Sequence, residues 1–164
     1  MKFVLRPATA GDAGAIAAIY NPYVADSGIT FETDPGTTAE MAARMSEAQR
    51  SNLPWLVAVA GDEVLGYAYA SKWKGRCAYR YAVESTVYLD GARKGQGIGK
   101  ALYTALIDEL RARSLRTAIG GIALPNVASV RLHERMGFKK VAHFEQIGFK
   151  QERWIDVGYW QLLL

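Results

Sequence analysis

The feature that most constrains the fold of this chain is a glycine-rich, basic turn at 90–100, which follows a β-prone run at 83–89. Glycine stands at every second position of the turn, and an amphipathic helical pattern begins at once. Without Cβ atoms, the turn leaves backbone N–H groups open to a ligand. A helix N-terminus adds unpaired N–H groups and a positive dipole end. We therefore expect a diphosphate site here, with glycines and cations at Gly95, Gly97, Gly99, Arg93, Lys94 and Lys100.

Composition places the chain among ordinary globular proteins. Its 164 residues are half hydrophobic and 22% charged, which predicts one domain over 1–164 with a sizeable core. The net charge of +4 fits an anionic ligand, but basic and aromatic residues form no long stripe typical of nucleic-acid binding. No apolar run is long enough to span a bilayer. The single Cys77 cannot form an intrachain disulfide, so we expect a cytoplasmic protein.

Hydrophobic periodicity predicts a mixed sheet with helices on its faces, in the order strand, two helices, three strands, helix, strand, helix, two strands. Capping boxes at 9–12 and 37–40 begin the first two helices, and Asn21–Pro22 should disturb or end the first. The expected strands are 3–6, 54–60, 64–70, 79–89, 117–122, 138–147 and 154–163, with the last two on either side of 148–150. The other two helices are expected after the glycine turn and at 127–136.

Spacing excludes two familiar phosphate motifs. A Walker A loop needs glycine where this chain has Lys94, and a hydroxyl residue where it has Ala101. The dinucleotide fingerprint fails because its third glycine position is occupied by Lys100. The turn therefore holds neither ligand in the manner of these motifs.

The segment 94–99 resembles the Q/R-x-x-G-x-G/A signature of the GNAT acetyltransferases, with Lys94 at the first position. A second segment, 126–138, is similar to the N-x-x-A/S-x-x-L-Y-x-x-x-G-F segment of that family. Further segments resemble its phosphinothricin and methionine sulfoximine N-acetyltransferase branch, namely 20–23, 31–33, 73–79, 83–88, 129–134, 148–150 and 154–158.

This resemblance implies a GNAT-like α/β fold, with a mostly antiparallel mixed sheet and helices on both faces. It implies acetyl-CoA as acetyl donor, a small amino acid or amino acid analogue as acceptor, a homodimer and no metal. Acetyl transfer would proceed by direct attack of the amine on the thioester in a ternary complex.

The resemblance assigns the general base to Glu84, acting directly or through a water. Burial would raise the pKa of its carboxyl into a useful range. In an alternative interpretation Glu84 pairs with Arg80, four residues earlier on the same expected strand face, which would lower that pKa. His133 stands where many family members have a tyrosine that protonates the leaving thiolate. A packing or hydrogen-bonding role for His133 is an equal alternative.

For acetyl-CoA, backbone groups at the end of the fourth strand would pair with the pantetheine arm like an added strand, and an N–H of Val87 or Tyr88 would polarise the thioester. Asn126 would reach the same arm, cap the following helix, or do both. Ser129 and Arg135 are weaker candidates, and Arg135 is equally well explained as an exposed helical arginine. The complete set of cofactor-binding candidates is Val87, Tyr88, Leu89, Lys94, Gly95, Gln96, Gly97, Ile98, Gly99, Lys100, Asn126, Ser129 and Arg135.

For the acceptor, Lys74 and Arg76 are candidates to bind a carboxylate, phosphinate or sulfoximine oxygen. A solvated loop, or contacts to CoA phosphates, would explain them equally well. By resemblance Phe31 supplies an apolar wall and Glu32 an amine contact, and Tyr79 is a further wall candidate. The last hairpin, around 147–150, is a candidate to reach across a dimer interface.

The sequence therefore predicts an acetyl-CoA-dependent N-acetyltransferase acting on the α-amine of a small amino acid analogue, of phosphinothricin, methionine sulfoximine or methionine sulfone type. One alternative is a GNAT enzyme that acts on a peptide N-terminus, a polyamine or an ordinary amino acid. An alternative of another class is a non-catalytic acyl-CoA-binding module, which would not need Glu84. We expect no nucleic-acid or membrane partner.

Overall fold

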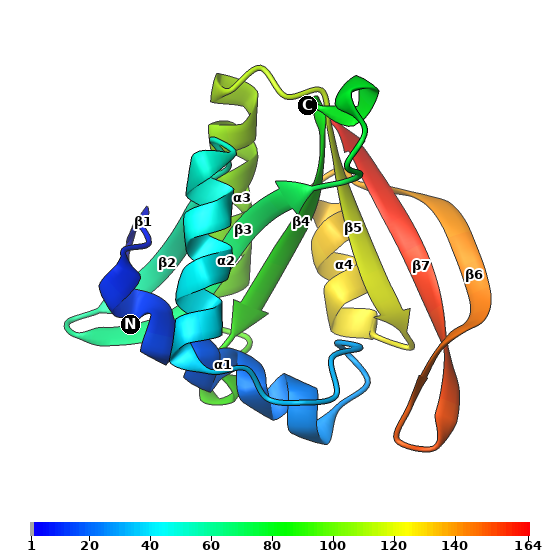
Figure 1. Ribbon diagram of the computed structural model, residues 1–164, viewed down its shortest axis with the longest axis horizontal. Coiled ribbons are helices and arrows are strands. Elements are labelled where there is room, and N and C mark those ends of the chain that lie inside the picture. Colours follow the sequence, from blue (N-terminus) through cyan, green and yellow to red (C-terminus); the bar gives the residue numbers. More distant parts are fainter. Residues whose placement is uncertain (1) are drawn as a thin grey trace.

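A computed structural model describes residues 2–164 as one seven-stranded sheet flanked by four α-helices (Figure 1). The strand order is β1-β2-β3-β4-β5-β7-β6. Neighbouring strands are antiparallel except β4 and β5, which are parallel. The strands are β1 (Val4–Pro7), β2 (Trp55–Ala60), β3 (Glu63–Lys72), β4 (Ala82–Leu89), β5 (Thr117–Leu124), β6 (Lys139–Lys150) and β7 (Arg153–Leu163). The helices are α1 (Ala13–Asp26), α2 (Thr38–Arg50), α3 (Ile98–Ala112) and α4 (Val127–Arg135).

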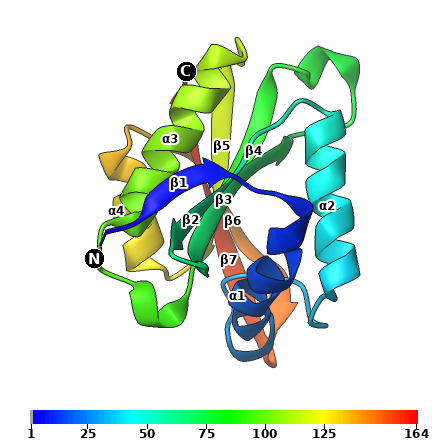
Figure 2. The same cartoon turned by 90° about the vertical axis from the view of Figure 1, so that its left-hand side faces the viewer.

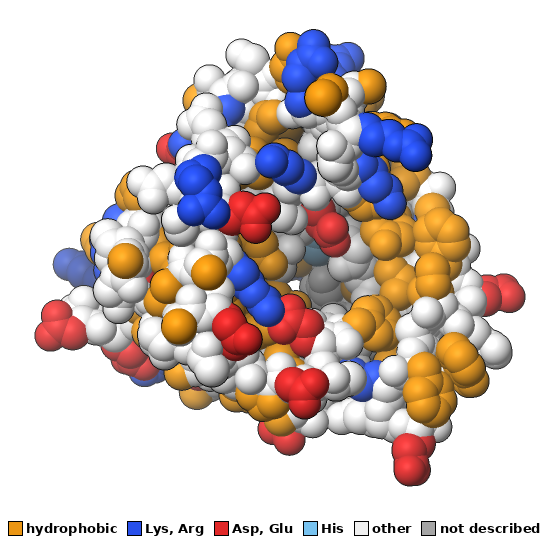
Figure 3. All heavy atoms as spheres, in the orientation of Figure 1, with side chains coloured by type: hydrophobic (Ala, Val, Ile, Leu, Met, Phe, Trp, Pro, Cys, Tyr) orange, Lys and Arg blue, Asp and Glu red, His pale blue; other side chains and the backbone are white. Residues whose placement is uncertain are grey.

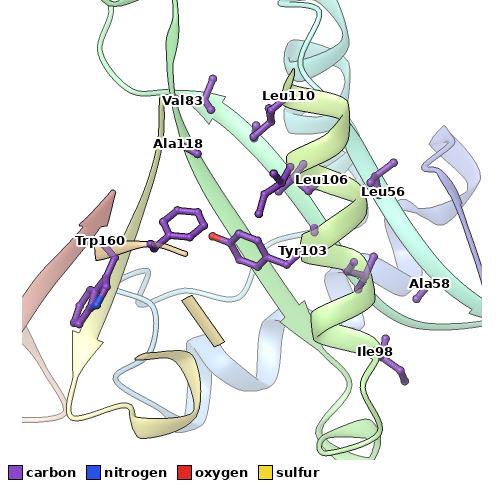
Figure 4. Packing of buried hydrophobic residues seen from close by; sticks show 14 of the residues in the cluster. Leu56, Ala58, Val83, Ile98, Tyr103, Leu106, Leu110, Ala118 and Trp160 are labelled. Carbon is purple, nitrogen blue, oxygen red and sulfur yellow. The ribbon is translucent and has the colours of Figure 1, made fainter. Parts of the chain in front are cut away.

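The helices cover both faces of the sheet, as Figure 2 shows. On one face α3 and α4 pack on the larger hydrophobic core, where Leu102, Leu106 and Leu110 are fully buried at helical spacing. Figure 4 shows Leu106 and Leu110 on α3 among the other residues of this core. On the other face α1 and α2 pack on β2 and β3 around Trp55 and Tyr67. The expected mixed α/β architecture is confirmed, and its element order follows the hydrophobic pattern of the sequence.

The parallel pair β4 and β5 opens soon after it begins. The two strands are paired only from Ala82 with Thr117 to Glu84 with Ile119. Beyond that point β4 stays paired with β3 to Leu89, and β5 stays paired with β7 to Leu124. The carboxyl halves of β4 and β5 therefore diverge, and Glu84 is the last residue of β4 to be paired on that side. This opening positions the site described below.

Two element ends differ from expectation. Of the two effects expected of Asn21–Pro22, to disturb or to end the first helix, the ending does not occur, because α1 continues to Asp26. Burial of Val24 beside Tyr20 on the core side of α1 holds the helix together despite the lost proline N–H. The fourth strand begins at Ala82 rather than at residue 79, because Cys77–Tyr79 form a 3₁₀ turn that ends with the Arg80 N–H bonded to the Cys77 carbonyl.

The last hairpin also differs from expectation. Residues 148–150 belong to β6, and the chain reverses at Gln151 and Glu152, whose φ angles are +52° and +57°. Positive φ at both central residues matches the right-handed twist of the flanking strands. Gly148 does not make a turn; an added Cβ there would lie 2.1 Å from the Phe31 ring.

Candidate active site

A cavity of about 660 Å³ lies in the opening between β4 and β5. Figure 3 shows it as a hollow in the surface that faces the viewer. Its wall combines backbone of β4 and β5, the start of α4, the segment around Thr30 and the tip of the last hairpin. The predicted site residues that line it are Phe31, Glu84, Val87, Tyr88, Asn126, Ser129 and His133. Residues that are far apart in the sequence therefore meet in one cavity.

Glu84 presents its carboxylate to this cavity from the point where β4 and β5 separate. Burial raises the pKa of this carboxyl above 4.5, and the positive charge of Lys74 acts in the opposite direction. The expected alternative of a Glu84–Arg80 pair is wrong, because Arg80 precedes the strand and its guanidinium lies over the Tyr81 ring. The Glu84 carboxylate is thus available to a ligand.

Gly121 of β5 lies opposite Glu84 across the opening. An added Cβ at this glycine would lie 3.4 Å from Glu84 Oε1 and 3.1 Å from Cε1 of Tyr159. A side chain at this position would therefore fill the space in front of the carboxylate. Tyr159 also lines the cavity, although it is not among the site residues expected from the sequence. Burial raises the pKa of its hydroxyl, and the charge of Glu84 adds to the shift.

His133 is buried, and both of its ring nitrogens have protein partners. Nδ1 lies 2.8 Å from the Ser129 carbonyl oxygen, which can only accept, so Nδ1 carries the hydrogen. Nε2 then accepts from the Tyr103 hydroxyl at 2.9 Å, and that hydroxyl lies 2.7 Å from Ser85 Oγ. Burial lowers the pKa of His133, which favours the neutral ring. This geometry supports the hydrogen-bonding alternative over delivery of a proton to a thiolate.

The end of β4 offers an unpaired backbone edge to the cavity. Val87 and Tyr88 pair with β3 on one side, through Ala68 and Tyr67. Their other side faces the opening that β5 has left, and both residues line the cavity. An extended ligand that carries amides can add to such an edge as a strand does.

The glycine turn follows β4 directly, outside the residues that line the cavity. Gly95 and Gly97 have φ angles of +78° and +81°, in the left-handed region, and Gly97 is the N-cap of α3. An added Cβ at Gly99 would lie 3.4 Å from the Leu89 side chain, so Gly99 serves helix packing. The expected helix start is confirmed, and two of the three glycines are required by backbone conformation.

The other residues of the turn differ in what they contact. Lys94 holds its ammonium 5.0 Å from the centre of the Tyr23 ring. The Gln96 amide donates to the Ala92 carbonyl at 3.4 Å, and Ile98 is buried in the core. Lys100 is exposed on the first turn of α3. Arg93, the third cation expected here, instead donates to the Glu63 carboxylate at 2.7 and 2.9 Å.

At the start of α4, the Asn126 side chain accepts from the Ser129 N–H at 3.1 Å. The N-cap interpretation of Asn126 is therefore confirmed, and the residue also lines the cavity. Arg135 is exposed at the other end of the helix and does not line the cavity.

Of the five acceptor candidates, only Phe31 lines the cavity. Glu32 forms a two-point ion pair with Arg44 at 2.7 and 2.9 Å. Lys74, Arg76 and Tyr79 are exposed in the loop before β4. This loop reaches the cavity wall through Trp73, whose ring packs edge-on against Tyr159 with 5.6 Å between centroids.

Sequence reasoning missed several residues of the cavity wall. They are Tyr20, Thr30, Tyr69, Ile147, Phe149 and Tyr159. Their aromatic or β-branched character is typical of a core, so no local pattern marks them as site residues. Among residues 2–164, no group of three or more His, Cys, Asp and Glu side chains is arranged to hold a metal ion. No helix in the same range is long and apolar enough to cross a membrane.

Comparison with known proteins gives consistent matches. Residues 5–158 match the model of the acetyltransferase (GNAT) domain. The chain is 41% identical over 157 residues to a phosphinothricin N-acetyltransferase of Streptomyces viridochromogenes, covering 96% of this chain and 85% of that protein. It is 35% identical over 160 residues to an L-methionine sulfoximine/L-methionine sulfone acetyltransferase of Salmonella typhimurium, covering 98% and 94%.

Among solved structures, the fold is similar to a GNAT superfamily phosphinothricin acetyltransferase from Sinorhizobium meliloti in complex with AcCoA. The TM-score is 0.96 and the sequences are 38% identical, over 100% of this chain and 89% of that one.

Proposed function

The chain belongs to the GNAT acetyltransferase family, and we propose that it moves the acetyl group of acetyl-CoA to the α-amine of a small amino acid analogue of phosphinothricin, methionine sulfoximine or methionine sulfone type. One observation carries the proposal beyond family membership. The half-buried Glu84 carboxylate faces a cavity beside the unpaired edge of β4, so a base lies where a donor and an amine can meet.

In this proposal the transfer needs no covalent enzyme intermediate. The α-ammonium of the acceptor gives a proton to Glu84, directly or through a water, and the neutral nitrogen bonds to the thioester carbonyl carbon. The carbon–sulfur bond then breaks. The second proton of the nitrogen ends on the CoA sulfur, and the proton held by Glu84 leaves to solvent.

The chain's backbone supplies the donor site in the same proposal. The free edge at Val87 and Tyr88 would pair with the pantetheine arm, with Asn126 and Ser129 facing it across the opening. Leu89 lies outside the cavity lining, and its carbonyl accepts from the Tyr23 hydroxyl at 2.6 Å, so its expected part in this pairing would be limited to the N–H. The N–H groups from Gly95 to Gly99 would hold the diphosphate at the start of α3, with Lys94 and Lys100 nearby. Arg135 lies outside the cavity, so in this proposal it could contact only a CoA phosphate that lies outside the cavity as well.

For the acceptor, we propose an apolar wall of Phe31, Ile147 and Phe149 and a positive rim. The positive charge of Lys74 acts against the effect of burial on the pKa of Glu84, which supports a role for its ammonium on the acceptor side of the cavity. In this proposal Arg76 adds a second positive charge to the rim. Together Lys74 and Arg76 would attract an acidic oxygen of the acceptor.

We also propose that the protein is a homodimer formed through the last hairpin. β6 is an edge strand, and large apolar side chains of the hairpin are exposed. Such an edge favours pairing with another chain. The exposed side chains are Val141, Phe144, Ile147, Phe149 and Trp154.

The proposal is tested by measuring thiol release from acetyl-CoA with phosphinothricin, methionine sulfoximine, methionine sulfone, ordinary amino acids, polyamines and short peptides. We expect turnover with the three analogues and little with the larger amines. Preference for peptides or polyamines would replace the acceptor assignment with that alternative. Acetyl-CoA that binds but stays intact with every amine would overturn the enzyme assignment in favour of a binding module.

A further inference from the structure

The last hairpin contains an irregularity that is held by one carboxylate. Between the pairs Phe144–Val157 and Gly148–Ile155, three residues of β6 stand opposite the single Asp156 of β7. Gln146, in the middle of the three, has a φ of +49°. Asp156 Oδ1 accepts from the Gln146 N–H at 2.9 Å. The same carboxylate therefore satisfies a backbone donor that the sheet ladder leaves free.

The other oxygen of Asp156 has a defined partner as well. Oδ2 lies 2.7 Å from Nε2 of His143. Nδ1 of His143 lies 3.0 Å from the ammonium of Lys140, which can only donate. Nδ1 is thus the acceptor, and Nε2 carries the hydrogen that it donates to Asp156. Both carboxylate oxygens are used to brace the bulge.

The bulge changes which residues reach the cavity. Ile147, Gly148 and Phe149 line the cavity, whereas the β6 residues before them do not. The Phe31 ring lies against the Gly148 backbone, where an added Cβ would be 2.1 Å away. The wall on this side is therefore a joint surface of the hairpin tip and the segment that carries Phe31.

A second contact joins these two segments. Lys150 is only 7% exposed, and its ammonium donates to the Thr30 carbonyl at 2.8 Å. The Thr30 hydroxyl in turn lies 2.6 Å from that of Tyr20 on α1. Burying an ammonium is costly, so a lysine here indicates a specific anchoring contact. Lys150 fixes the segment before Phe31 to the hairpin tip.

We infer that Asp156 and Lys150 are positioning residues for acceptor binding, which together hold the wall formed by Phe31 and residues 147–149. Asp156 sets the direction of the hairpin tip, and Lys150 fastens the Phe31 segment to it. Neither acts on the reacting atoms. This inference rests on the proposed function only for the identity of the acceptor.

The test uses Asp156→Ala, Lys150→Met and the double variant, each as the full chain, with Asp62→Ala and Lys139→Met as exposed controls. We expect the acceptor KM to rise by about tenfold or more in each single variant, with kcat within about twofold and the acetyl-CoA Kd unchanged. Asp156→Asn keeps an acceptor for the Gln146 N–H but loses the acceptor for His143 Nε2–H, so its acceptor KM should lie between those of wild type and Asp156→Ala. Because both residues hold one wall, the double variant should raise KM by less than the product of the single effects.

Hydrogen exchange gives a readout that needs no acceptor. We expect faster exchange at 27–33 and 145–150 in Asp156→Ala, with α3 unchanged. The inference is overturned if wild type is active and both single variants have the same acceptor KM and the same exchange rates as wild type. It is also overturned if the variants lose as much affinity for acetyl-CoA as for the acceptor. Inactivity of wild type with every amine would instead overturn the proposed function, and the exchange result would still decide this inference.

Discussion

The Tyr103 hydroxyl lies 2.9 Å from Nε2 of His133, inside a chain of hydrogen bonds from Ser85 to the Ser129 carbonyl. This chain links β4, α3 and α4 behind the cavity. It fixes the tautomer of His133 and connects the last turn of α4, through Tyr103, to Ser85, which follows the last residue of β4 paired with β5. The residue at the position expected for a general acid is thus a connector between elements.

Tyr103→Phe should destabilise the protein without removing the donor site. The change leaves His133 Nε2 without its donor in a buried place, which costs about 1–3 kcal/mol of unfolding free energy. Urea denaturation measures this loss, with the exposed Tyr79→Phe as control. An unchanged free energy of unfolding would show that the hydrogen bond is not made in solution.

His133 should also make stability depend on pH. Its pKa in the folded protein is lowered from 6.5 by burial, so the unfolded chain binds the proton more readily. The free energy of unfolding should therefore fall as pH decreases below about 6.5, and this part of the fall should be absent in His133→Gln. Parallel urea titrations of the two proteins between about pH 7.5 and pH 5.5 provide the comparison. Identical slopes would contradict the prediction.

Glu84→Gln should lower kcat/KM by about 10²- to 10⁴-fold, because the amide cannot accept the proton. In wild type, the acid limb of the pH profile should lie above pH 4.5, since burial raises the pKa of Glu84. Lys74→Met removes a positive charge that stabilises the Glu84 carboxylate, so the acid limb of the pH profile should move to higher pH. Lys72→Met is the matched control. A limb that stays in place in Lys74→Met would exclude this electrostatic effect.

Gly97→Ala should weaken acetyl-CoA binding. The φ of +81° places this residue in the left-handed region, where a Cβ costs about 1–2 kcal/mol and the N–H groups must shift to relieve it. We expect a rise of about tenfold in the Kd measured by calorimetry. Gly91→Ala is the control, because an added Cβ there meets open space. Equal affinities of the two variants would remove the turn from the donor site.

Asp12→Asn should destabilise the protein at neutral pH by about 1–2 kcal/mol. Asp12 accepts from Nη1 and Nη2 of Arg6, each at 2.8 Å, and from the Thr9 N–H at 2.7 Å, and the Arg6 contact lowers its pKa to about 2. The lowered pKa means that this stabilisation is present above pH 3.8 and is lost as pH falls toward 2. Acid titration of both proteins should show their free energies of unfolding converging in that window.

The part of the cavity formed by β4 and α4 was largely predictable from local pattern. Glu84, Val87 and Tyr88 stand just before the glycine turn, so their place on one strand follows from the sequence, and all three line the cavity. Asn126 and Ser129 follow from the helix start that they form. Strand and helix periodicity are local properties, so a single sequence carries them.

The acceptor side was much less predictable. Ile147, Phe149 and Tyr159 line the cavity, yet no local pattern separates them from core residues. Lys74, Arg76 and Tyr79 were chosen for their chemistry, and the structure places them in an exposed loop outside the lining. A cation in a loop has no periodicity that reveals which way it points.

The sequence by itself determined the order of strands and helices, the glycine turn before α3 and the position of Glu84 beside that turn. These features depend on residues close together in the chain, where propensity, capping and glycine conformation act directly. Only the tertiary structure decided that β4 and β5 separate after Glu84, that His133 is enclosed by Tyr103 and Ser129, and that Asp156 and Lys150 bond to the backbone of Gln146 and Thr30. Those contacts join segments far apart in the chain, and packing rather than local preference selects them.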